Sequence, residues 1–425
     1  MLVLIVSMTA VAISAALMPG DPVKTPKASA AVAKQSLVPT PNVASLLRAA
    51  VVLPGRTPAL PWPATGEGAV AVQGIGAVAA GPDQVPVPIA SVTKVMTALV
   101  VLHDHPLTTT SSGPELRMTK ADNLAWIQAS EDDDSNLEVV AGEELSERQL
   151  LEALMIPSAD NIANYLAVWD AGSIAAFVAK MNAEAALLGM TRTHYADASG
   201  LDPASRSTAV DQAHLAGVAM AIPALAGIVD NSSVRMPTGE AWGYNPLVGI
   251  DGVVGIKSGF TQAANACLAI AAKRTVDGRE VLVIVVTLGQ PDGLYGAANA
   301  DQVLLKASTP FLRSYRVLSS GEVVAQVRAP WTSGASSAVV ATPATVVGWP
   351  GLALSFAVVP RIVLAKQYLA SLHRGPQNMS VLLKAGAAVG SVIVRSGGTP
   401  QATVPITLAD PLAAPPAGWS PSAGS

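Results

Sequence analysis

One apolar segment limits the folds that are open to this chain. Residues 86–102, PVPIASVTKVMTALVVL, pass from a proline-bounded entry into a helix-length run that is apolar from Ile89 to Leu102 except for small hydroxyl residues and one lysine, Lys94. A helix that is hydrophobic on all of its sides is buried inside a domain. We therefore expect a buried helix here. A lysine is unusual in such a helix, which suggests a specific role for Lys94.

Ser91 and Lys94 are three residues apart, so their side chains meet on one face of this helix. A hydroxyl is a weak nucleophile that needs a neighbouring base, and burial turns a lysine into such a base by disfavouring its charged form. Unpaired N–H groups at the helix start would stabilise a developing negative charge. The spacing suits acyl transfer. The alternative is a capping serine followed by a surface lysine whose stem covers apolar neighbours.

Composition excludes several classes of protein. The chain has 425 residues, of which 50% are hydrophobic, and this is enough for two or three domains with large cores. Its 26 Lys+Arg and 30 Asp+Glu give a net charge of -4 with no basic block, so we expect no nucleic-acid partner. The single cysteine, Cys267, closes no internal disulfide, and the histidines lack the spacing of zinc ligands, so no metal or other cofactor is expected. The acidic run 131–134 is interpreted as a solvated turn.

The N-terminal residues indicate a membrane or secretory address. Residues 1–18, MLVLIVSMTAVAISAALM, contain no charge and are interpreted as a membrane anchor or a signal peptide. The Pro- and Ala-rich residues 19–62 predict an extended linker. We expect an extracytoplasmic protein, anchored to the cell membrane by residues 1–18 or secreted after their cleavage. The sequence predicts no oligomeric state.

The remaining chain divides by pattern into two folded parts and a tail. Residues 63–316 alternate short apolar strands with helices, including a hairpin at 68–80 and a helix at 172–190, and predict a mixed α/β domain of the α+β kind. Residues 317–412 are β-branched runs broken by Gly and Pro, which predict a small β-rich domain. Residues 413–425 have the composition of a disordered tail.

Two further stretches carry polar groups that a serine nucleophile would need. In residues 150–170 a helical pattern is broken at Pro157, so Ser158, Asp160 and Asn161 are expected in a loop that lines a cleft, or alternatively at a helix cap. In residues 252–273 the sequence GIKSGFT begins an edge strand with Lys257 and Ser258 side by side, an arrangement that suits a carboxylate. The alternative is a plain strand with an exposed lysine.

The order and spacing of these three elements resemble a known family. S-x-x-K at Ser91, a serine-led polar loop about 65 residues later and K-S-G about 100 residues further are similar to the three motifs of the serine acyl-transferases that bind penicillin. Sequences outside the three motifs support the resemblance, such as PWPATGEGAVAV and MTRTHYADASGLDPASRSTAVDQAHLA. Residues 60–316 resemble the serine D-alanyl-D-alanine carboxypeptidases, which are low-molecular-weight penicillin-binding proteins, and especially the actinobacterial type. The resemblance implies the transpeptidase fold shared by penicillin-binding proteins and β-lactamases.

The resemblance also implies an activity and catalytic roles. The enzyme would remove the last D-alanine of peptidoglycan pentapeptides through an acyl-enzyme, and β-lactams would inhibit it covalently. Ser91 would be the nucleophile and Lys94 its base, while Ser158 would relay a proton to the leaving D-alanine. The N–H groups of Ser91 and Phe260 would form the oxyanion hole.

Substrate-binding residues follow in the same way. Lys257 and Ser258 would hold the terminal carboxylate, Gly259 would let the substrate approach the strand closely, and Thr261 is expected in the pocket. The family pattern has threonine at position 258 and asparagine at position 160, where this chain has serine and aspartate. Because an ionised aspartate only accepts hydrogen bonds, we expect either Asp160 in the usual position or Asn161 turned inward to supply the amide.

Two other functions remain open at this stage. A β-lactamase shares the three motifs but needs a further glutamate to activate water, and none is evident from the sequence. A wall-binding protein that keeps the fold without the chemistry would account for Asp160. Covalent labelling by a penicillin, followed by its turnover, separates the three hypotheses.

Overall fold

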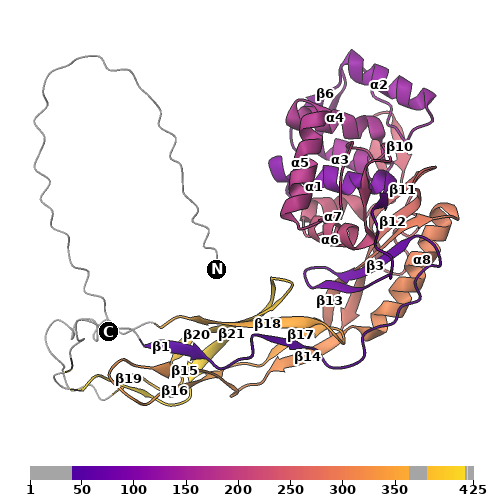
Figure 1. Ribbon diagram of the computed structural model, residues 1–425. Helices are drawn as coiled ribbons and strands as arrows, with labels where there is room; N and C mark the ends of the chain where they lie inside the picture. The colour runs from indigo at the N-terminus through magenta and orange to yellow at the C-terminus, as the bar shows by residue number, and fades with distance from the viewer. Residues whose placement is uncertain (1–40, 363–380, 417–418, 420–425) are drawn as a thin grey trace, which may run out of the picture. The chain divides into compact units, whose positions relative to one another are not determined.

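The structure is a computed structural model that describes residues 41–362, 381–416 and 419 (Figure 1). The predicted anchor or signal, residues 1–18, and the first part of the predicted linker lie outside the described residues. Within the described part, no single helix has the length and apolarity needed to cross a membrane. Two bent helix pairs meet those criteria of length and composition together: α4 (Asp160–Ala171) with α5 (Ile174–Leu187), and α6 (Ala209–Ala219) with α7 (Pro223–Val229).

A five-stranded antiparallel sheet organises the first folded part. Its strand order is β11-β12-β13-β3-β4, so β11 is an edge strand and the pair β11/β12 is a hairpin. The predicted hairpin at 68–80 is confirmed as β3 and β4. The strands are β3 (Glu67–Val72), β4 (Gly76–Ala80), β11 (Val253–Thr261), β12 (Asn265–Val276) and β13 (Arg279–Gln290).

Helices cover both faces of this sheet. Successive residues of a strand point to opposite faces, so each strand contributes side chains to two cores. Along β12, Cys267, Ala269 and Ala271 join the core formed with α1 (Lys94–Asp104) and α6. Leu268, Ile270 and Ala272 join a second core that includes Leu304 and Leu305 of α8 (Gly293–Ser308). Figure 1 shows α8 on one side of the sheet and the other helices opposite it.

The predicted buried helix is confirmed. It begins as a 3-10 turn, η1 (Ala90–Thr93), and continues as α1 (Lys94–Asp104), in which Lys94 through Leu102 are all buried. The helix predicted at 172–190 is α5. The other helices are α2 (Lys120–Glu131), α3 (Glu147–Met155), α4 (Asp160–Ala171), α5 (Ile174–Leu187), α6 (Ala209–Ala219), α7 (Pro223–Val229), α8 (Gly293–Ser308) and η2 (Thr309–Phe311).

Short strand pairs connect these helices. They are β5 (Val87–Pro88) with β8 (Arg206–Ser207), β6 (Glu115–Arg117) with β7 (Glu144–Ser146), and β9 (Ser233–Met236) with β10 (Gly239–Trp242). The pair β5/β8 brings the residues before Ser91 next to the residues that follow the turn at 197–205.

The C-terminal part is β-rich, as the sequence predicts, but it is not built from residues 317–412 alone. Its seven-stranded sheet has the order β1-β15-β16-β21-β20-β18-β2, and both of its end strands come from before the catalytic motifs. The strands are β1 (Asn42–Ser45), β2 (Ala50–Val52), β15 (Val323–Arg328), β16 (Ser336–Val340), β18 (Ala353–Pro360), β20 (Ala388–Ser396) and β21 (Thr399–Leu408). Two further pairs are β14 (Arg313–Leu318) with β17 (Ala344–Gly348) and β19 (Val381–Leu383) with β22 (Leu412–Ala413).

The linker prediction is therefore wrong for residues 42–52. Val51 pairs with Leu354 of β18, and Asn42 pairs with Arg328 of β15. The residues between the two strands are also bonded, since the N–H of Leu46 donates to the Val324 carbonyl and the N–H of Phe356 donates to the Ala49 carbonyl. The segment is short and mostly exposed, so backbone pairing rather than an apolar pattern holds it.

A proline at position 51 tests this pairing. Because proline has no N–H and breaks a sheet ladder, Val51→Pro should lower the free energy of unfolding by about 1 to 3 kcal/mol. Thermal unfolding measures the change, with Val51→Thr as a β-branched control that keeps the ladder. Equal melting temperatures for the two variants would contradict the role of β2.

Candidate functional site

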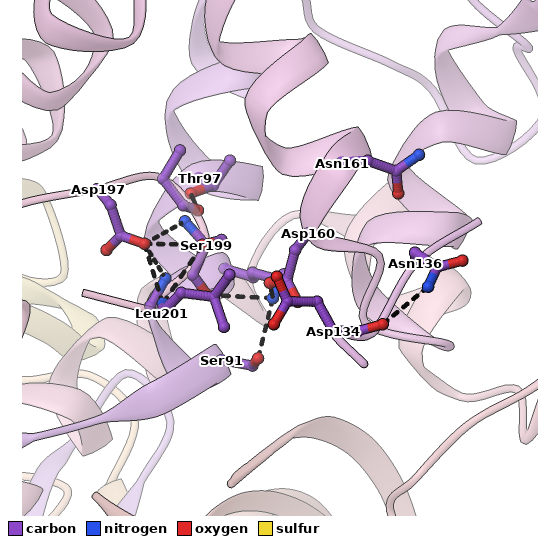
Figure 2. A network of polar contacts seen from close by, with 12 residues as sticks. Ser91, Thr97, Asp134, Asn136, Asp160, Asn161, Asp197, Ser199 and Leu201 are labelled. Carbon is purple, nitrogen blue, oxygen red and sulfur yellow. Dashed lines mark hydrogen bonds and ion pairs between the residues drawn. The ribbon is translucent and has the colours of Figure 1, made fainter. Parts of the chain in front are cut away.

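The side-chain amine of Lys94 is the centre of the site. Its Nζ lies 2.9 Å from Ser91 Oγ, 2.5 Å from Asp160 Oδ1 and 3.0 Å from the Ser199 carbonyl oxygen. The Lys94 side chain is fully buried and that of Asp160 is 5% exposed. Figure 2 shows Ser91, Asp160 and the Ser199 segment converging on this point. The structure thus brings together the first two motifs, as the sequence predicts.

These three partners fit both protonation states of the amine. Ionised Asp160 and the Ser199 carbonyl only accept hydrogen bonds, so each takes one N–H of Lys94 in either state. Ser91 is a hydroxyl, which donates to the lone pair of a neutral amine or accepts the third N–H of an ammonium. Proton transfer from Ser91 to Lys94 therefore leaves the other two bonds in place, and Asp160 stabilises the ammonium that forms.

Close backbone packing fixes the serine against strand β11. A Cβ on Gly259 would lie 2.7 Å from the Ser91 nitrogen, so only glycine allows this approach. Ala90, directly before the nucleophile, has a φ of 46°, a left-handed conformation that costs energy in a non-glycine residue. Gly259 thus admits the Ser91 backbone, and its role in the approach of the substrate stays a prediction.

The second motif forms the turn between α3 and α4. Ser158 is 3% exposed and has a φ of 66°. Asp160 is the first residue of α4, where the N-cap position belongs to Ala159 with no side-chain cap bond. The Asp160 carboxylate thus binds Lys94 and does not cap the helix.

Asn161 does not turn toward the serine. Its Oδ1 accepts from the N–H of Leu137 at 3.0 Å and its Nδ2 donates to the carbonyl of Leu137 at 2.9 Å. In Figure 2 its amide is directed away from Ser91. The alternative in which Asn161 turns inward is therefore wrong, because its amide oxygen and nitrogen are both bonded to Leu137 and hold that residue against α4.

The third motif places a second lysine in the same interior. Lys257 is 1% exposed and Ser258 is 4% exposed, so the alternative of an exposed lysine is wrong. Lys257 Nζ donates to the Ser258 carbonyl at 2.8 Å. Burial, and then the positive charge of Lys94, hold the pKa of Lys257 well below its usual range, while Asp160 opposes this effect.

The remaining predicted residues lie where β11 ends. Phe260 is 55% exposed, so its side chain can contact a ligand only from the surface. Thr261 Oγ1 accepts from the N–H of Ala264 at 3.1 Å and thereby closes the β11/β12 hairpin. This contact gives Thr261 a structural role that the sequence did not suggest.

Sequence reasoning missed an acidic residue beside the site. Asp134, in the run interpreted as a solvated turn, lies next to Asp160 in Figure 2, and the N–H of Asp160 donates to the Ser135 carbonyl at 2.7 Å. Burial and the charge of Asp160 raise the pKa of Asp134. Burial also raises the pKa of Asp160 itself, against the opposing effect of Lys94. An acidic run alone gives no signal of this placement.

Sequence reasoning also missed the loop at 197–205, whose Ser199 carbonyl accepts a hydrogen bond from Lys94. This stretch contains the sequence DASGL, whose aspartate two residues before Ser-Gly is a turn signal, but the signal does not reveal which element the turn contacts. Among residues 41–362 and 381–416, no group of three or more His, Cys, Asp or Glu side chains is arranged to hold a metal ion.

Sequence comparison relates this chain to cell-wall peptidases. A family model described as D-alanyl-D-alanine carboxypeptidase matches residues 76–292. The chain is 37% identical over 223 residues to D-alanyl-D-alanine carboxypeptidase DacB2 of Mycobacterium tuberculosis, covering 50% of this chain and 71% of that protein. It is 31% identical over 208 residues to a D-alanyl-D-alanine endopeptidase of Escherichia coli, covering 47% of this chain and 63% of that protein.

Solved structures share the fold. Penicillin binding protein 5 from Haemophilus influenzae aligns with a TM-score of 0.57 at 18% identity, covering 85% of this chain and 99% of that one. The carboxypeptidase DacD from Francisella tularensis aligns with a TM-score of 0.56 at 19% identity, covering 86% and 97%. The predicted fold class is confirmed.

The carboxylate of Asp160 holds the Lys94 amine beside Ser91. Asp160→Ala removes this acceptor, so kcat/KM should fall about ten- to a hundredfold, because a hydrogen bond to a charged group is lost. Asp160→Asn keeps an oxygen that accepts from Lys94 and should recover most of this loss. Initial rates at pH 7 measure both variants, with Asp132→Ala in the exposed acidic run as the control. A wild-type rate in Asp160→Ala would contradict the assigned role.

Proposed function

Because this chain belongs to the family of D-alanyl-D-alanine carboxypeptidases, we propose that it removes the terminal D-alanine of peptidoglycan pentapeptides through an acyl-enzyme at Ser91. The observation that carries the proposal is the buried amine of Lys94, 2.9 Å from Ser91 Oγ and held by Asp160. This contact supplies a base directly beside the Ser91 hydroxyl. No cofactor takes part in the proposed reaction.

Acylation uses the groups in sequence. Ser91 Oγ attacks the carbonyl carbon of the penultimate D-alanine while its proton passes to Lys94. The N–H groups of Ser91 and Phe260 donate to the oxyanion that forms. Ser158, in the turn before α4, relays the proton to the nitrogen of the leaving D-alanine. The C–N bond breaks and the acyl group remains on Ser91.

Deacylation repeats these steps with water as the nucleophile. Lys94 accepts a proton from water as it attacks the ester, and Ser91 recovers its proton when the ester bond breaks. Among the described residues, no glutamate hydrogen-bonds to Ser91, Lys94 or Asp160, so the site supports a carboxypeptidase better than a β-lactamase. Asp160 supports catalysis by stabilising the ammonium, which argues against a wall-binding protein without chemistry.

The substrate lies outside the cytoplasm, and the proposed location follows from this. The uncharged residues 1–18 support an extracytoplasmic enzyme that is anchored to the membrane or secreted after cleavage. Penicillins, which mimic the acyl-D-alanyl-D-alanine unit, are the inhibitors expected for this site.

Intact-mass measurement with benzylpenicillin tests the nucleophile. The wild type should gain the mass of one penicillin, and Ser91→Ala should gain none, because among the described serines only the Ser91 hydroxyl is hydrogen-bonded to a lysine amine. A remaining adduct on Ser158 or Ser258 would overturn the assignment. Rapid loss of the wild-type adduct with penicillin turnover would favour a β-lactamase, and no wild-type adduct would favour the non-catalytic alternative.

Lys257 should act on the carboxylate of the substrate. Lys257→Ala should lower kcat/KM for an acyl-D-Ala-D-Ala peptide about ten- to a hundredfold, because a hydrogen bond to a charged group is lost. The C-terminal amide of the same peptide should be a poor substrate for the wild type and should be little affected by the substitution. Lys273→Ala, on the exposed part of β12, is the control for loss of positive charge. If the wild type hydrolyses acid and amide equally well, the pocket is misassigned.

A further inference from the structure

The loop at 197–205 is organised by a single carboxylate. Asp197 Oδ2 accepts hydrogen bonds from the N–H groups of Gly200 and Leu201 at 2.7 and 2.9 Å and from the hydroxyl of Ser199 at 2.7 Å. Its Oδ1 accepts from the hydroxyl of Ser205 at 2.5 Å. The loop contains no helix or strand, and these bonds from one side chain join groups at both of its ends.

This path turns two successive carbonyl groups toward helix α1. The Ala198 carbonyl accepts from Thr97 Oγ1 at 2.6 Å, and the Ser199 carbonyl accepts from Lys94 Nζ at 3.0 Å. Thr97 and Lys94 are three residues apart and therefore share one face of α1. The loop is thus attached to the helix both at the base and one turn beyond it, as Figure 2 shows for Thr97, Ser199 and Asp197.

The same loop also supports the residue before the nucleophile. A Cβ on Gly200, which has a φ of 91°, would lie 1.9 Å from the carbonyl oxygen of Ala90. The loop backbone is therefore in direct contact with the strained residue that precedes Ser91. A displaced loop would disturb both the serine and its lysine.

We propose that Asp197 is a positioning residue for the Ser91–Lys94 pair, acting through the carbonyl group of Ser199. Asp160 and the Ser199 carbonyl take two of the three directions available at Nζ, and the third then points to Ser91. Without the Ser199 carbonyl the amine can rotate about its side chain, and its lone pair leaves the hydroxyl. This inference rests on the proposed function, since it concerns the base of that reaction.

Acylation kinetics of Asp197 variants test the proposal. Asp197→Ala should lower the rate constant for acylation by a fluorescent penicillin about a hundredfold, since a misplacement of about 1 Å costs that much. For a peptide substrate kcat should fall while KM stays within about threefold. Asp197→Asn keeps an oxygen that accepts from Gly200 and Leu201, so it should recover activity to within about tenfold of the wild type.

Two further variants separate positioning from general stability. Thr97→Val keeps the shape of the side chain but loses the bond to the Ala198 carbonyl, and it should slow acylation about tenfold even if Asp197→Ala does not fold. Asp170→Ala removes another buried carboxylate, one that binds Lys180 at 2.6 Å. Asp170 is ten residues after Asp160 on α4, about 15 Å away, so this variant should lower the melting temperature and leave acylation unchanged.

The outcomes also distinguish this inference from the proposed function. A wild type that forms no penicillin adduct overturns both. A wild type that is acylated, with folded Asp197→Ala or Thr97→Val reacting at the same rate, overturns only the role of Asp197. Equal slowing in Asp170→Ala and Asp197→Ala would assign the effect to stability and would equally overturn it.

Discussion

The structure around the site depends on keeping a lysine amine inside a protein. An isolated buried charge is strongly unfavourable and persists only when it is paired and fully hydrogen-bonded. Lys94 satisfies this condition with groups from three separate segments: its own helix start, the first residue of α4 and the loop at 197–205. These segments lie far apart in the sequence, so the site exists only when the helical part has assembled around α1.

A second lysine makes the electrostatics of the site more demanding. Lys94 and Lys257 both lie in the interior, and the positive charge of Lys94 disfavours the charged form of Lys257. Asp160 is close enough to act on both, and Asp134 and Asp197 add negative charge around it. The carboxylates thus offset the repulsion between two cations, while a substrate carboxylate at Lys257 would favour its ammonium form. Binding of the correct substrate and charging of Lys257 are therefore coupled.

The sequence pattern predicts the elements that depend on residues close together in the chain. The apolar run at 89–102, the turn at Pro157 and the β11/β12 hairpin follow from hydrophobic period and turn residues, and so does the meeting of Ser91 with Lys94. The strands at 42–52 were missed because they are short, exposed and held by backbone bonds that leave no pattern in the side chains. The placement of Asp134 and Asp197 was missed because it depends on tertiary contacts, and a turn signal does not identify the partner of the turn.

The groups that surround positions 160 and 161 determine which of them must be an aspartate and which an asparagine. Consecutive positions on a helix point about 100° apart, so one of the two faces Lys94 and the other faces Leu137. Leu137 presents both an N–H and a carbonyl, and the asparagine amide can bond to both, whereas an ionised aspartate can only accept. With the residues exchanged, a carboxylate would face the Leu137 carbonyl without a donor, and the turn that holds Asp134 near the site would be released. The amide is therefore required at position 161, which leaves position 160 to supply the acceptor for Lys94. At position 160 an asparagine would bond the amine without charge, whereas the aspartate pairs the amine with a negative charge.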